Sequence, residues 1–190
     1  MKTLATLKKH LRAGTVYRRS DLMDLSTSVD RHLRQLVADG TLVKLSGGLY
    51  YKPKETAFGK APADEEELVK SFLKDDDFVI TYPNNYNSLG LGTTQLYNKR
   101  RVYNRKRHGE FTLGNRNFEF VRKPYVPNKV TKEFLLVDLV NNLKNLEEDS
   151  SAVLTNVESK LSKMDTKKLK QLVHKFGTIS TKKFFSPLIP

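Results

Sequence analysis

Apolar residues recur at helical spacing through the first part of the chain. They predict a helix over residues 4–11, a second helix capped by Ser20 and extending to Leu25, and a third that begins near Thr27 and ends at Asp39-Gly40. Residues 26–28, Ser-Thr-Ser, form a polar turn between the second and third helices. In the third helix the residues predicted to face inward are Val29, Leu33, Leu36 and Val37.

A β-hairpin is predicted directly after these helices. Residues 41–45 and 49–52 alternate as strands do, the tight turn Ser46-Gly47-Gly48 joins them, and Pro53 ends the pairing. Three short helices followed by a small hairpin make a winged helix-turn-helix. The sequence therefore predicts such a domain over residues 1–56.

The remainder of the chain predicts a second α+β domain, residues 57–190, after a linker at about residues 53–63. A helix over 65–73 and a strand over 78–81 come first, and the pattern leaves residues 82–95 open between a loop and a short helix. We expect hairpins from three strands, 101–104, 109–113 and 118–121, with a turn at 114–117. The predicted C-terminal helices are 131–146, 151–164 and 166–176, with Gly177 as a cap and one more turn over 180–185.

The charge of the chain narrows its expected partners. Lys and Arg number 34 against 21 Asp and Glu, a formal net charge of +13, which favours a polyanion such as nucleic acid, an anionic membrane or an acidic protein. No apolar run approaches the roughly 20 residues of a membrane helix, and no apolar segment of a secretory signal is present near Met1. There is no cysteine. We therefore expect a cytoplasmic protein without a membrane partner.

The third predicted helix is the candidate DNA reader. In a helix-turn-helix the second helix of the motif lies in the major groove, where Arg can pair with guanine and Gln with adenine. Hydroxyl side chains at its start can bind phosphate, and Asp30 is expected to orient Arg31 or Arg34 or to assist at the helix start. The predicted DNA-binding residues are Arg18, Arg19, Ser20, Thr27, Ser28, Arg31, Arg34, Gln35, Lys44 and Lys52.

A second basic segment lies in the predicted hairpin region. Residues 96–132 carry 11 Lys or Arg against two Glu, with aromatic residues interleaved. Such strands can contact a phosphate backbone, bind RNA with aromatic stacking or dock an acidic protein. They can also simply form the solvent-exposed face of a sheet. The candidate residues of this basic patch are Lys99, Arg100, Arg101, Arg105, Lys106 and Arg107.

The sequence gives no pattern for catalysis. The four histidines stand at no metal-ligand spacing with another ligand, and residues 89–94 lack the lysine and the spacing of a phosphate-binding loop. The carboxylates cluster in solvated runs without an identifiable acid–base pair. We expect no enzyme, no metal and no cofactor.

About the first 125 residues resemble the AbiEi-type antitoxins of type IV toxin–antitoxin (abortive infection) systems. In the predicted winged domain the resembling segments are Val29-Asp30-Arg31-x-Leu33, Asp39-Gly40-x-Leu42 and Gly48-Leu49-Tyr50-Tyr51-x-Pro53. The more specific segments follow it, namely Thr56-x-Phe58-Gly59-x-x-Pro62, Thr81-Tyr82 and Asn87-Ser88-Leu89-Gly90-Leu91-Gly92-Thr93-Thr94-Gln95.

This resemblance implies a protein with two activities. The winged domain would bind double-stranded operator DNA and repress its own operon, and the second domain would counter a nucleotidyltransferase-like toxin in phage defence, without necessarily binding it. The alternative is a protein-interaction module that binds a toxin or another acidic partner directly and has only general affinity for nucleic acid.

Overall fold

The computed structural model describes residues 3–93 and 96–189 and has a mixed α+β architecture. It consists of two compact units. The N-terminal unit comprises residues 1–76 and 111–117, and the C-terminal unit comprises residues 77–110 and 118–190. The domain boundary predicted at residue 56 lies inside the N-terminal unit. That residues 1–56 and 57–190 carry separate functions stays a prediction.

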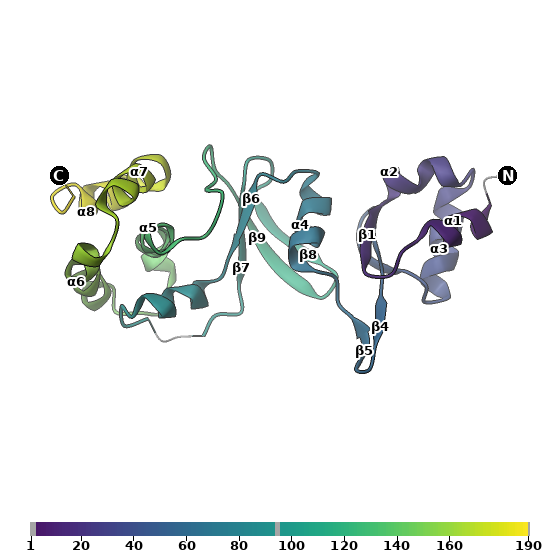
Figure 1. Ribbon diagram of the computed structural model, residues 1–190, viewed down its shortest axis with the longest axis horizontal. Coiled ribbons are helices and arrows are strands. Elements are labelled where there is room, and N and C mark those ends of the chain that lie inside the picture. The colour runs from purple at the N-terminus through teal and green to yellow at the C-terminus, as the bar shows by residue number, and fades with distance from the viewer. Residues whose placement is uncertain (1–2, 94–95, 190) are drawn as a thin grey trace. The chain divides into compact units, whose positions relative to one another are not determined.

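The first part of the N-terminal unit contains the three helical segments and the hairpin expected from the apolar pattern, together with a further strand, β1 (Figure 1). A three-stranded antiparallel sheet of order β1-β3-β2 places Tyr51 opposite both Val16 and Val43. The elements are α1 (Leu4–His10), β1 (Thr15–Arg18), α2 (Arg19–Leu22), the 3-10 turn η1 (Met23–Leu25), α3 (Val29–Ala38), β2 (Val43–Ser46) and β3 (Leu49–Lys52).

Leucines from all three helices form the core of this part. Leu7, Leu22, Leu33 and Leu36 are completely buried in one cluster. Val37, predicted to face inward, is only partly buried at the edge of this cluster. Burying each such side chain contributes about 1.5–3 kcal/mol, so this core fixes which face of α3 remains outside.

The second helix begins one residue before its predicted cap. Arg18 occupies the N-cap position, and its backbone N–H donates to the carboxylate of Asp21 at 3.0 Å. The Ser20 hydroxyl instead donates to Asp21 at 3.2 Å. The prediction of Ser20 as the cap is wrong because a carboxylate at the third helical position reaches back to satisfy the helix start.

The predicted linker is an ordered β-hairpin. Strands β4 (Lys54–Thr56) and β5 (Gly59–Ala61) pair antiparallel, and the Thr56 hydroxyl closes the turn by donating to the Gly59 carbonyl at 2.7 Å. Gly59 has φ +97°, a conformation that residues with side chains rarely adopt. Helix α4 (Glu65–Leu73) follows at its predicted position, and Asp64 caps it.

A four-stranded sheet of order β6-β7-β9-β8 follows. Its strands are β6 (Phe78–Thr81), β7 (Arg100–Asn104), β8 (Gly109–Leu113) and β9 (Arg116–Arg122). The prediction of successive hairpins is wrong for β7, which pairs antiparallel with β6 and parallel with β9. A turn signal fixes only neighbouring strands, so the apolar pattern could not show this long-range pairing.

Helices supply the core of the C-terminal unit. The segment 82–95, which the sequence leaves undecided between a loop and a helix, contains a 3-10 helix, η2 (Pro83–Leu89). Residues 87–95 are called the AbiEi-like stretch below; two of them, Thr94 and Gln95, lie outside the described residues. The C-terminal helices are α5 (Lys132–Asn142), α6 (Ser150–Lys160), α7 (Thr166–Phe176) and α8 (Ile179–Phe185), with 3-10 turns η3 (Leu143–Asn145) and η4 (Leu161–Lys163) after α5 and α6.

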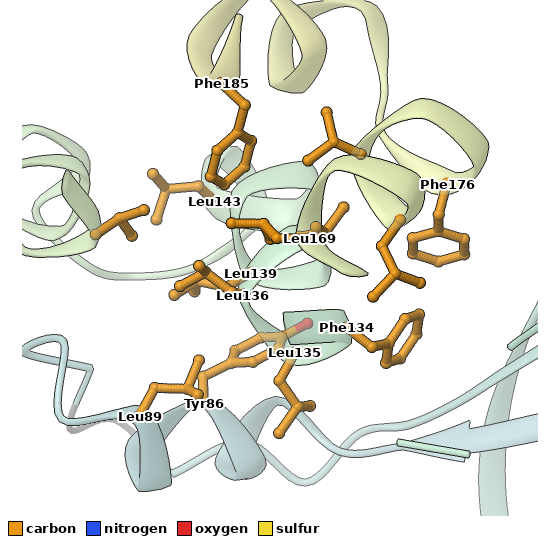
Figure 2. Close-up of a cluster of buried hydrophobic side chains, with 14 of the residues drawn as sticks. Tyr86, Leu89, Phe134, Leu135, Leu136, Leu139, Leu143, Leu169, Phe176 and Phe185 are labelled. Carbon is orange, nitrogen blue, oxygen red and sulfur yellow. The ribbon is translucent and has the colours of Figure 1, made fainter. Parts of the chain in front are cut away.

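Figure 2 shows the core around α5, with Tyr86 and Leu89 of η2 on one side of the helix and side chains of α7 and α8 on the other. Within it Asp138 is completely buried and accepts hydrogen bonds from Tyr86, Tyr103 and Asn142. Burial raises the pKa of Asp138, although the hydroxyl donors oppose the shift. This network holds η2, β7 and α5 together.

Candidate nucleic-acid interface

The turn before α3 is fixed by two buried side chains. The hydroxyl of Ser26 lies 2.7 Å from Nδ1 of His32 and accepts a hydrogen bond from the backbone N–H of Ser28 at 3.2 Å. Ser26 is 4% exposed and His32 is 7% exposed. These hydrogen bonds, here called the Ser26–His32 clamp, hold the turn against α3 while the side chain of Thr27 stays exposed.

The start of α3 is open to a ligand. In the described chain no side chain caps it, because Ser28 occupies the N-cap position without making a capping bond. Unpaired N–H groups at a helix start favour phosphate. A shallow cavity of about 400 Å³ lies here, lined by the turn, the first turn of α3, Arg19 and Met23.

Asp30 has a different partner from the one expected. Its carboxylate accepts two hydrogen bonds from Arg19, at 2.6 and 2.7 Å, and the bond from Arg19 holds the pKa of Asp30 below its ordinary value. The prediction that Asp30 orients Arg31 or Arg34 is wrong for the side chain, since only its backbone carbonyl accepts a bond from Arg34, at 3.3 Å. The folding of α2 beside α3 brings these sequence-distant charges together.

The outer face of α3 carries the predicted base-reading side chains. Arg31, Arg34 and Gln35 are all exposed, whereas Leu33 and Leu36 on the opposite face are buried. The hydrogen bond from Arg34 to the Asp30 carbonyl uses only Nε. The two terminal nitrogens of the guanidinium can therefore still donate to a bound molecule. The helix therefore presents two guanidinium groups and one amide to solvent.

The hairpin of β2 and β3 contributes one exposed cation. Lys44 is exposed on β2, and Arg19 donates its backbone N–H to the carbonyl of Gly48 at 2.8 Å, so the turn lies beside the start of α2. Lys52 is half-buried, and its ammonium group donates to the Leu11 carbonyl just after α1 at 3.1 Å. Arg18 is also half-buried, 3.6 Å from Asp21. Lys52 and Arg18 thus already interact with other groups of the protein, and Lys44 is the more accessible cation.

The basic patch is less uniform than its sequence. Arg101 is only 6% exposed and forms an ion pair with Glu119 at 2.8 Å, so its place in an exposed patch is a wrong prediction. Residues 101–104 of β7 are all buried, and Glu119, which faces Arg101 on the neighbouring strand β9, compensates its charge. Arg105 pairs with Asp77 at 2.7 Å. Lys99, Lys106 and Arg107 are exposed and Arg100 is half-exposed.

The residues that position this interface were missing from the sequence prediction. The sequence places Ser26 only in a polar turn and gives His32 no partner at metal-ligand spacing. One signal could have indicated a buried role for His32. It is a polar residue at an inward position of the helix, four residues before the apolar Leu36. No local pattern indicates the pairing of Arg19 with Asp30.

Comparison with known proteins supports the fold only. No family model matches the chain, and no curated protein matches it. A solved structure, that of the RV2827C protein from Mycobacterium tuberculosis, is similar with a TM-score of 0.58 and 15% identity over 98% of this chain and 74% of that chain. At this identity the likeness is one of architecture, and it agrees with the mixed α+β class.

None of the helices in the described part of the chain is long and apolar enough to cross a bilayer. Residues 3–93 and 96–189 contain no group of three His, Asp or Glu side chains placed to hold a metal ion.

Proposed function

We propose that the N-terminal unit contains a winged helix-turn-helix that binds double-stranded DNA with sequence preference. In this assignment α2 and η1 form the first helix of the motif, α3 lies in the major groove, and β2 and β3 form the wing. The observation that carries the proposal is the outer face of α3, where Arg31, Arg34 and Gln35 are exposed on a helix whose other face is buried. These side chain types match the edges of guanine and adenine.

Phosphate contacts would orient the helix in the groove. Thr27, Ser28 and the open start of α3 offer hydroxyl and backbone donors, and Lys44 offers a charge from the wing. The Arg19–Asp30 pair lies in the same cavity as Arg31. Arg19 keeps donors beyond this pair, and its proximity to Asp30 reduces the net positive charge there.

For the whole chain we propose an autorepressor and antitoxin of a type IV toxin–antitoxin system that counters a nucleotidyltransferase-like toxin. This part of the proposal depends on the sequence resemblance to the AbiEi-type antitoxins, of which the AbiEi-like stretch around η2 is the more specific part. The structure adds that η2 is anchored to α5 by the bond from Tyr86 to Asp138 at 2.7 Å. Rescue of cells that express the neighbouring toxin gene is its direct test.

Substitutions in α3 and the wing test the DNA assignment. Arg31→Ala and Arg34→Ala should each weaken binding to the upstream DNA by about 1–3 kcal/mol and relax the preference at one base position. Lys44→Ala should weaken binding to every duplex alike. Lys9→Ala, an exposed cation of α1, is the matched control. Parental binding by the first three variants in a gel-shift titration would refute the assignment of α3.

The second candidate function is a protein-interaction module. Its supporting observation is the set of fully or largely exposed apolar side chains outside α3, with Phe58 at the β4–β5 turn 102% exposed and Ile179 on α8 77% exposed. This function predicts stable co-purification with the product of the neighbouring gene and DNA binding without sequence preference. Phe58→Ser would then abolish co-purification and leave DNA binding unchanged.

A further inference from the structure

A cavity of about 490 Å³ lies within the N-terminal unit. Its walls come from β2, β3, the β4–β5 hairpin, α4 and the β8–β9 turn, all of which belong to that unit. They are largely apolar, with Val43, Leu45, Tyr51, Pro62, Leu68 and Leu113 among the lining residues. The volume lies within the roughly 300–1,000 Å³ of pockets that hold small organic ligands.

Hydrogen bonds keep the walls of this cavity in place without a ligand. The hydroxyl of Tyr51 donates to the carbonyls of Ala61 and Pro62, at 3.0 and 3.2 Å. The backbone N–H of Gly114 donates to the Leu45 carbonyl at 2.7 Å, which joins the β8–β9 turn to β2. A preformed cavity loses little entropy on binding, so these bonds favour a ligand site.

The charged side chains that line the cavity are cationic. Lys44, Lys60 and Arg116 line it, and no Asp or Glu is among its described lining residues. Arg116 donates to the Ala63 carbonyl at 2.8 Å and lies 3.6 Å from Glu65, which offsets part of its charge. Lys60 donates to the Gly40 carbonyl at 3.2 Å and keeps two further N–H groups, while Lys44 is exposed.

We propose that this cavity binds a small organic anion with an apolar body and a single carboxylate. The apolar walls would take the body, and Lys44 with Lys60 would pair with the carboxylate. Apolar walls with only cations at the rim favour such an anion over a neutral or cationic molecule of the same shape. The site shares Lys44 with the proposed DNA-binding surface, but it does not rest on the DNA-binding function, because binding of its ligand would be detected without DNA.

The test is an NMR titration of the full-length protein with two probes of equal shape, naphthalene-1-carboxylate and its neutral carboxamide. We expect saturable shifts of the Val43, Leu45 and Leu113 amides with the carboxylate, and binding of the carboxamide at least about fivefold weaker. Lys44→Gln should weaken carboxylate binding about fivefold, whereas Lys9→Gln, at a residue that does not line the cavity, should not change it.

A second variant addresses the cavity itself. Val43 is 40% exposed on the edge strand β2, so Val43→Phe should fold and fill part of the space. It should abolish the carboxylate shifts. Equal binding of the two probes, shifts confined to other residues, parental binding by both cavity variants, or no saturable shift with either probe would each overturn the proposal.

Discussion

Single residues set the local stability of the N-terminal unit, and Lys74 is a clear case. It follows α4 in the left-handed conformation, with φ 56° and ψ 45°, which glycine adopts at less cost. Lys74→Gly should therefore raise the free energy of unfolding by about 0.5–1 kcal/mol in urea denaturation. Glu66→Gly, within the same helix, should lower it by about 1 kcal/mol. A destabilised Lys74→Gly protein would show that side-chain contacts of Lys74 outweigh its backbone strain.

Asp39 should make stability depend on pH in the acid range. Hydrogen bonds from Lys8 and then Thr41 lower its pKa from 3.8 to about 2. A depressed pKa stabilises the folded state above pH 3.8, and this contribution is lost as the pH falls toward 2. Asp39→Asn should therefore melt at a lower temperature than the parent at pH 7, and the difference should shrink across that acid window. A difference that is constant with pH would contradict the role of the Lys8–Asp39 pair.

At the scale of elements, the position of α3 depends on the turn that precedes it. Ser26→Ala removes the partner of His32 Nδ1 and of the Ser28 N–H, both in a buried or half-buried setting. An unsatisfied buried group costs about 1–3 kcal/mol, so this variant should be less stable by that amount. It should also bind operator DNA more weakly, because Thr27 and Ser28 lose their fixed positions.

Thr27→Ala is the matched control, since this side chain is exposed and outside the Ser26–His32 clamp. It should leave the stability within about 0.5 kcal/mol of the parent. Thermal melts and gel shifts on the same preparations separate the two effects. Parental DNA affinity in Ser26→Ala would show that the clamp stabilises the unit without positioning the interface.

Elements with a strong local signal could be predicted from the sequence. Helix α4 has an acidic start after the Asp64 cap, and α7 follows the Asp165 cap with apolar residues on one face, so both match their predicted bounds. The sequence does not indicate the β4–β5 hairpin, because its short strands are largely exposed and lack apolar alternation. The inward position of Arg101 could not be predicted either, because it depends on a parallel neighbour strand whose paired residue, Glu119, lies 18 residues away in sequence.

At the scale of the whole molecule, the charge explains an affinity for polyanions but not a preference among them. The net charge of +13 is spread over both units, and several cations are already paired, including Arg19, Arg101 and Arg105. Counterion release would give any duplex some affinity. Sequence preference comes from side chains that reach base edges or from sequence-dependent DNA shape, and we propose that α3 supplies the base-edge contacts.

The most direct test of the account is binding of the purified full-length protein to the DNA upstream of its own gene, compared with a scrambled duplex, across a salt series. With about six phosphate contacts, the logarithm of the binding constant should fall with the logarithm of salt concentration at a slope near −5. We expect that slope and a clear preference for the upstream DNA at every salt concentration. Equal and weak binding to both duplexes would contradict sequence recognition by α3 and leave the protein-interaction function as the better account.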